Sequence, residues 1–247
     1  MSRTRRAVTL AAVAVSLALA MGGCVGGPPA PTPSPEPSTP LPTDTAEPIA
    51  APVDPLATVT ALVARPEALE LRDASGAVVA SLDYLEPAGP AIETLTLVFG
   101  APPVDEEYGG SNHTVPSTAH RWDGFELWEN RFVDRAAEFA DEPRTLHRPS
   151  YSVVFTAPSR AAIELTTEQG VEAGTSWTEL EAMPGLQVNP SGCSGPYLDY
   201  IERDETWPDG TIHAQRFGVD FVDWEHWDDP SIVSRVRAPM PIYDGCA

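Results

Sequence analysis

The chain reads Ala68-Leu-Glu-Leu-Arg-Asp-Ala-Ser-Gly76-Ala-Val-Val-Ala-Ser-Leu82 where its class of fold is decided. Two short runs with apolar positions flank a turn sequence that ends in glycine, which predicts two strands joined by a tight turn. Further along, Ile92, Leu95 and Phe99 have the i, i+3, i+7 spacing of a short helix, which residues 100–103 (Gly-Ala-Pro-Pro) end. A strand pair followed by a helix indicates a domain that contains both α and β structure.

A second helix and further strands are expected beyond this stretch. Ser176-Trp-Thr-Glu179 is a capping-box sequence, and the helix that it opens ends at Pro184-Gly185. Residues 104–119 are polar and contain several Gly, Ser and Asn residues, which predicts a long loop. The fold class that we expect is therefore α+β, with antiparallel sheet and two short helices. The remaining strands are expected at residues 121–128, 151–156, 162–166, 197–201, 212–222 and 232–236.

The two predicted helices suggest an internal repeat. Residues 89–100 align with residues 174–185 at an offset of 85 residues, and Trp122 then aligns with Trp207. The alignment predicts two tandem helix-on-sheet repeats, at about 68–157 and 158–247. This layout resembles that of secreted β-lactamase inhibitory proteins and of small helix-and-sheet envelope lipoproteins. The resemblance is architectural, so it assigns the folded domain to no family and transfers no functional residue.

The N-terminus has the three parts of a secretory signal. It begins Met1-Ser-Arg-Thr-Arg-Arg6, continues with an apolar run over residues 7–21, and reaches small residues before Cys24. A helix needs about 20 residues to cross a bilayer, so this run is too short to be a span. We expect residues 1–23 to be a signal peptide that is removed.

The end of this segment resembles the lipobox of bacterial lipoproteins. Residues 20–24 read Ala-Met-Gly-Gly-Cys, with Met21 where leucine is usual. The resemblance implies that Cys24 is lipidated, becomes the mature N-terminus and anchors the protein on the extracytoplasmic face of the cell membrane. The absence of lysine and the Ala, Arg, Pro and Asp bias look actinobacterial. The alternative is an ordinary signal peptide followed by a free cysteine.

Residues 24–55 are expected to form a stalk. Proline recurs at nearly every second or third position, and large apolar residues are almost lacking, so the segment cannot offset the entropy of ordering. A polyproline-like stalk of this length would extend ~90 Å at about 3 Å per residue. The folded domain is then expected over residues 56–247.

The charge of the chain excludes several classes of partner. Asp and Glu total 36 against 15 Lys and Arg, and removal of the signal with its three arginines takes the formal net charge from −21 to −24. Such a surface repels phosphate backbones, so no nucleic-acid partner is expected, and the lipid anchor is the expected membrane contact. Phosphate-binding loops and dinucleotide fingerprints are absent from the sequence, and no cofactor is expected.

The two other cysteines, Cys193 and Cys246, are expected to form a structural disulfide, as pairs of cysteines in exported domains usually do. Residues 191–195, Ser-Gly-Cys-Ser-Gly, have the wrong spacing for the Gly-X-Ser-X-Gly turn of a nucleophilic serine. Zinc-ligand pairs and calcium-loop patterns are also missing from the sequence, so no metal site is expected. The sequence therefore contains no catalytic motif.

Aromatic and acidic residues gather in residues 220–229, Asp-Phe-Val-Asp-Trp-Glu-His-Trp-Asp-Asp. Exposed tryptophans mark interaction sites and indole faces also stack on sugar rings, whereas the simpler interpretation is that they pack a small core. Our first hypothesis is a non-enzymatic binding module for an envelope protein or glycan. The alternative is a glycan-directed hydrolase that uses Asp223, Glu225, Asp228 or Asp229. The candidate binding surface consists of Trp122, Trp128, Trp224, His226 and Trp227.

Overall fold

The computed structural model describes residues 54–111, 115–131, 148–190, 192, 194–206 and 210–242. The predicted signal peptide, Cys24, almost all of the predicted stalk, Cys193, Trp207 and Cys246 lie outside these residues. In the part that is described, no helix combines the length and the apolar character needed to cross a membrane.

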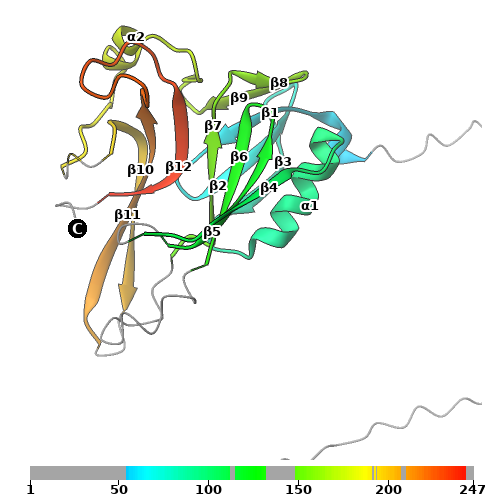
Figure 1. The fold of residues 1–247 in the computed structure, drawn as a ribbon, viewed down its shortest axis with the longest axis horizontal. Helices are drawn as coiled ribbons and strands as arrows, with labels where there is room; N and C mark the ends of the chain where they lie inside the picture. The colour runs from blue at the N-terminus through cyan, green and yellow to red at the C-terminus, as the bar shows by residue number, and fades with distance from the viewer. Residues whose placement is uncertain are drawn as a thin grey trace, which may run out of the picture. The chain divides into compact units, whose positions relative to one another are not determined.

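The strands form two sheets (Figure 1). The five-stranded sheet A has the order β3-β2-β1-β9-β8, and the seven-stranded sheet B has the order β10-β11-β12-β7-β6-β5-β4. Sheet A consists of β1 (Val59–Ala64), β2 (Ala68–Asp73), β3 (Val78–Asp83), β8 (Ser159–Arg160) and β9 (Ile163–Thr167). Sheet B consists of β4 (Val104–Tyr108), β5 (Ser117–Trp122), β6 (Phe125–Asn130), β7 (Tyr151–Phe155), β10 (Tyr197–Thr206), β11 (Ile212–Val222) and β12 (Arg235–Pro241).

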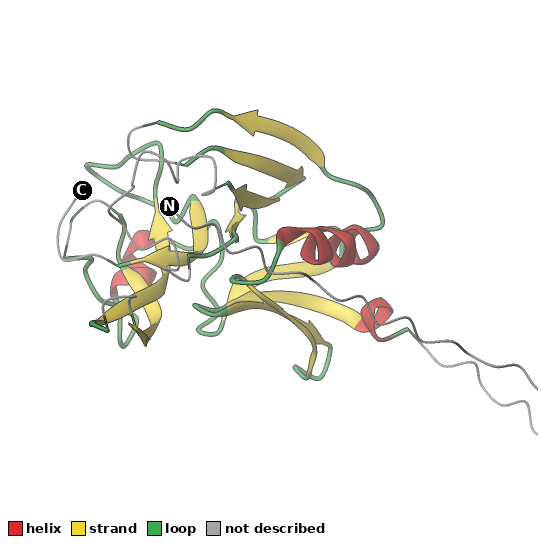
Figure 2. Cartoon of the chain, turned by 90° about the horizontal axis from the view of Figure 1, so that it is seen from below, coloured by secondary structure: helices red, strands yellow, loops and turns green. Residues whose placement is uncertain are grey.

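Within the described residues, two α-helices and one 3-10 helix accompany the sheets, and Figure 2 shows these helices beside the strands. The 3-10 helix η1 (Pro55–Thr58) precedes β1, α1 (Ala88–Phe99) follows β3, and the short α2 (Trp177–Glu181) follows β9. The predicted capping box is present in α2, where Ser176 and Glu179 bond reciprocally. The protein is therefore α+β and mainly β, as the sequence indicated at this coarse level.

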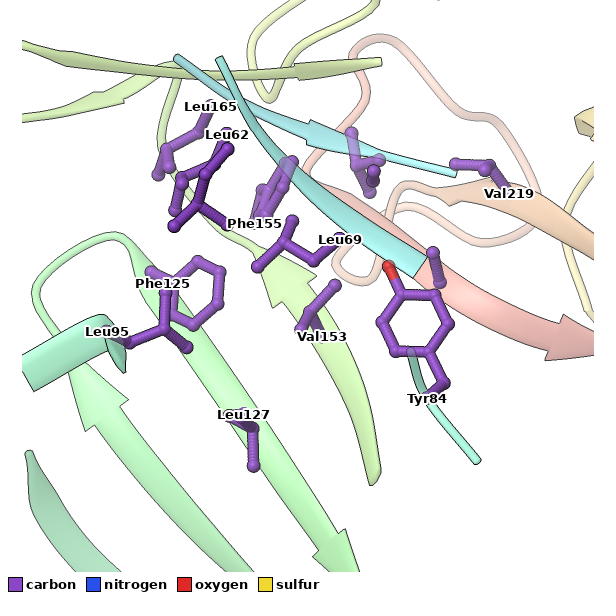
Figure 3. Packing of buried hydrophobic residues seen from close by; sticks show 14 of the residues in the cluster. Leu62, Leu69, Tyr84, Leu95, Phe125, Leu127, Val153, Phe155, Leu165 and Val219 are labelled. Atoms are coloured by element: carbon purple, nitrogen blue, oxygen red, sulfur yellow. The ribbon is translucent and has the colours of Figure 1, made fainter. Parts of the chain in front are cut away.

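One hydrophobic core joins α1 to both sheets (Figure 3). Leu62 and Leu165 come from sheet A, Phe125 and Phe155 come from sheet B, and Leu95 comes from α1, and each of these side chains is fully buried. The alternation of apolar residues along the strands directs one face of each sheet to this core.

The pairing within the sheets corrects two expectations. Among the described strands the ladders are antiparallel except between β1 and β9, which are parallel, with Leu62 opposite Leu165. β9 from the second predicted repeat thus completes the sheet that β1, β2 and β3 begin, and β12 pairs with β7 in sheet B. The halves at 68–157 and 158–247 therefore share both sheets and do not form one helix-on-sheet unit each.

Two local predictions were also wrong. Residues 104–119, expected as a loop, contain β4 and the start of β5. β4 is an edge strand with three acidic residues. These charges made the segment look like a loop in the sequence, and at the edge of the sheet they oppose pairing with further strands. Residues 121–128, expected as one strand, instead turn at Asp123-Gly124 and form a hairpin, with Trp122 opposite Phe125. Gly124 has φ 79°, which is the conformation that such a turn requires.

β10 is tied to sheet A by an ion pair. A bulge between Leu198 and Ile201 interrupts its pairing with β11, and Asp199 within it has φ 51°. The bulge directs the Asp199 side chain to Arg65, whose Nε donates to Oδ2 at 2.5 Å. Arg65 also donates to Glu168 at 3.2 Å, so a single guanidinium links the two sheets at this edge.

Candidate binding surface

The connection between β11 and β12 is organised by one buried carboxylate. Asp223 follows β11 directly and is 2% exposed. Its oxygens accept N–H bonds from Glu225 and His226, both at 3.3 Å, and from Ser231 and Ile232, at 3.0 and 3.4 Å. Both ends of the loop are therefore bound to the same side chain, which fixes the intervening residues.

Two neighbouring segments fix the loop further. The Trp224 N–H donates to Ser234 Oγ at 2.7 Å, which closes the base of the loop. On the other side, the Val233 N–H donates to Thr175 O at 2.8 Å and the Trp177 N–H donates to Ser231 O at 2.9 Å. α2 thus lies beside the chain that leads into β12 (Figure 1). The loop has a defined conformation because its backbone is bonded on three sides.

The bonds to Asp223 also change its acidity. The hydrogen bond from the Ser231 amide, together with those from Ile232 and His226, lowers the pKa of the Asp223 carboxyl to about 2. Hydrogen bonds to the charged form stabilise that form. Asp223 is therefore a structural carboxylate that stays ionised, and not a proton donor at neutral pH.

Asp223→Ala is expected to release this loop. Hydrogen exchange at residues 225, 226, 231 and 232 should accelerate by at least about tenfold, because four amides lose their acceptor. Asp228→Ala is the matched control, since the exposed Asp228 side chain bonds to nothing among the described residues. Equal exchange rates in the two variants would contradict the role of Asp223.

Acid should have the same effect on the parent protein. The folded pKa lies below the ordinary value of 3.8, so the stabilisation by Asp223 is complete above about pH 5 and is lost as the pH falls through about 2. Tryptophan fluorescence recorded from about pH 5 to about pH 1 measures this transition, and it should be absent from Asp223→Ala.

The fixed loop holds large apolar side chains in solvent. Trp224 is 60% exposed, Trp227 is 49% exposed and Ile232 is 44% exposed. The Arg235 guanidinium lies 5.1 Å from the centroid of the Trp224 ring, which is cation–π distance. We call Trp224, Trp227 and Ile232, with the acidic residues between them, the tryptophan surface. Large apolar side chains that one loop holds in solvent mark a candidate interaction site.

The acidic residues of the tryptophan surface are solvated. Glu225, Asp228 and Asp229 are exposed, and in the described part of the chain their side chains have no hydrogen-bond or ion-pair partner. His226 is exposed as well and places Nδ1 3.4 Å from Asp223 Oδ2. Among the described residues no group of three His, Cys, Asp or Glu side chains could hold a metal ion.

Trp122 does not belong to this surface. It is 4% exposed, its Nε1 donates to Ala101 O at 2.8 Å, and its ring packs on Phe99 and Phe125. The prediction that Trp122 contributes to binding was therefore wrong. The error follows from the missed hairpin. In a single strand residues 122 and 128 would share a face, whereas the turn at 123–124 puts them on opposite faces.

Trp128 lies on the other face of sheet B and is half-buried. Its Nε1 donates to Glu126 at 2.8 Å, and its ring centroid lies 4.7 Å from that of Tyr108. The Arg121 guanidinium lies 5.8 Å from both rings and donates to Glu126 at 3.0 Å. β12 and β7 separate β6 from β11, so the structure does not bring Trp128 together with Trp224 and Trp227.

The packing and bonding of β11 just before the loop were not predicted from the sequence. Asp220, on β11, is 0% exposed and is bonded by Arg237 of β12, with Nε to Oδ1 at 2.9 Å. Gly195 packs so tightly on β11 that a Cβ there would lie 1.7 Å from Phe221 O. Gly195, which lies in the segment that does not match the Gly-X-Ser-X-Gly pattern, therefore allows the backbone to pack closely on β11. The only sign of this close packing in the sequence is that Gly195 is followed by a proline.

Comparisons with known proteins add no identification. No protein-family model matches the chain, no curated protein matches it and no solved structure matches it.

Proposed function

We propose that the chain is a membrane-anchored lipoprotein of the cell envelope whose folded domain binds a partner and catalyses no reaction. The observation that carries this proposal is the exposure of Trp224 and Trp227, 60% and 49%, on a loop that Asp223 fixes. Tryptophans are enriched among the residues that dominate binding energy, and a preformed loop loses little entropy when it binds.

The proposal also includes a lipid anchor and a stalk that together hold the folded domain outside the membrane. The lipobox-like residues before Cys24 support lipidation there, and the proline-rich composition of residues 24–55 supports a stalk that holds the domain away from the membrane. The composition of the exported chain supports a Cys193–Cys246 disulfide, which would staple the C-terminus to the segment that packs on β11. The binding partner is then a protein or glycan of the envelope.

A glycan-directed hydrolase is supported less well. A glycosidase needs one carboxyl group with a raised pKa in apolar surroundings, and the pKa of Asp223 is lowered instead. Glu225, Asp228 and Asp229 stand in solvent, which does not favour a proton donor either. The arrangement is a solvated acidic face beside exposed indoles.

A pull-down tests the binding proposal. The full chain, solubilised in detergent, is used as bait for envelope extract beside a Trp224→Ala/Trp227→Ala variant. Loss of one hot-spot tryptophan costs about 2 kcal/mol or more, so the variant should bind the recovered partner at least about 30-fold more weakly.

Leu97→Ala/Val104→Ala is the matched control, because these residues are 69% and 73% exposed and lie on α1 and β4. The proposal fails if both double variants bind equally, or if the parent recovers no partner.

A further inference from the structure

The tryptophan surface carries charge that the protein leaves uncompensated. Glu225, Asp228 and Asp229 fall within five positions of one fixed loop, and none has a partner among the described residues. Like charges on one short loop repel one another, and Asp223 bonds both ends of this loop. A cationic occupant would remove the repulsion.

The surface also shows a cation on one of its indoles. The guanidinium of Arg235, which comes from the first position of β12, lies 5.1 Å from the ring centroid of Trp224. Trp227 has no such neighbour among the ring contacts of the described residues and is 49% exposed, with Asp228 and Asp229 next to it in the chain. An exposed indole and solvent-exposed carboxylates are both groups that an arginine or lysine side chain binds.

We propose that the occupant of the tryptophan surface is a polypeptide segment that carries arginine or lysine side chains. A cationic side chain stacks on Trp227 and is bonded by the carboxylates of Asp228 and Asp229, while Ile232 and Trp224 contact apolar parts of the same segment. This inference rests on the proposed binding function and narrows its partner class. A neutral glycan could stack on the indoles but would leave the three carboxylates uncompensated.

Charge distribution supports the choice of a protein partner. The mature chain has a formal net charge of −24, so its field attracts a basic partner before contact and accelerates association. That field is spread over the molecule, whereas the tryptophan surface is one site. The contribution of its carboxylates to the affinity must therefore be compared with that of a variant that changes the total charge by the same amount.

Calorimetric titration of the full chain in detergent with a hexa-arginine peptide tests the inference. Glu225→Gln/Asp228→Asn/Asp229→Asn should weaken binding at least about tenfold, and Trp227→Ala should do the same. The matched control is Glu86→Gln/Glu93→Gln/Asp204→Asn, which removes three exposed carboxylates from α1, the segment before it and β10. The control should change the affinity less than about threefold.

Three results would overturn the inference. One is no binding of hexa-arginine by the parent, and another is an equal loss in the two charge variants, which would show general attraction only. The last is tighter binding of an N-acetylglucosamine hexamer than of hexa-arginine, with the same dependence on Trp227. If the parent does not bind hexa-arginine while the envelope pull-down still depends on Trp224 and Trp227, the proposed binding function is retained and the proposal of a basic partner is rejected.

Discussion

Gly195→Ala is expected to destabilise the protein by about 4 kcal/mol or more, which is at the upper limit for single substitutions. A Cβ at this position would lie 1.7 Å from the carbonyl oxygen of Phe221 and 2.8 Å from its carbonyl carbon. Both atoms belong to the backbone of β11, which is paired on both sides in sheet B, so no flexible side chain can move aside. The Gly195 amide also bonds the Asp220 carboxyl, and the substitution would displace that donor.

Urea unfolding followed by tryptophan fluorescence measures this effect. Gly89→Ala is the control, because a Cβ there meets nothing within 4 Å and Gly89 lies in α1. Alanine at such a helical position should stabilise by about 0.4–1 kcal/mol. A loss of less than about 1 kcal/mol for Gly195→Ala would mean that this segment does not pack on β11.

Arg237→Ala is expected to cost about 3–5 kcal/mol, because it leaves a buried carboxylate without its cation. Asp220 is 0% exposed, and Arg237 is bonded to both of its oxygens. Burial raises the pKa of the Asp220 carboxyl, against the attraction of Arg237 and a hydrogen bond from the Gly195 amide. Without Arg237 the pKa of Asp220 should rise further.

The pH dependence distinguishes a lost ion pair from lost packing. A folded pKa above the unfolded value gives stability at low pH that is lost as the pH rises. The deficit of Arg237→Ala relative to the parent should therefore shrink from pH 7 to pH 5 in urea unfolding. The double variant Asp220→Leu/Arg237→Met should recover most of the loss, because it buries no charge. An equal deficit at both pH values would contradict this explanation.

Local patterns were sufficient for the elements that depend on local spacing. The helix over 91–99 and the strand over 212–222 match α1 and β11 closely, since each carries its own periodicity and its own stop signals. The exposure of Trp224 and Trp227 agrees with the charged residues around them. These features require no knowledge of the distant chain.

What the sequence did not predict depends on pairing between distant residues or on a single turn. The parallel pair β1–β9 has no local signal, because each strand is short and its neighbour lies elsewhere in the chain. The turn at Asp123-Gly124 was a readable hairpin sequence, and missing it reversed the face assigned to Trp122. The role of Asp223 depends on Ser231 and Ile232, which approach only when the loop closes.

The β1–β9 pair also has a consequence for the order in which the protein assembles. Arg65, just after β1, bonds Glu168, just after β9, across 103 residues of chain. A growing polypeptide therefore produces β1, β2 and β3 long before the strand that covers the open edge of β1. During that interval the edge can pair with other chains, and contacts of such long range form slowly. Premature termination before residue 163 leaves this edge permanently open, so chains that lack β9 should aggregate while chains that include it fold.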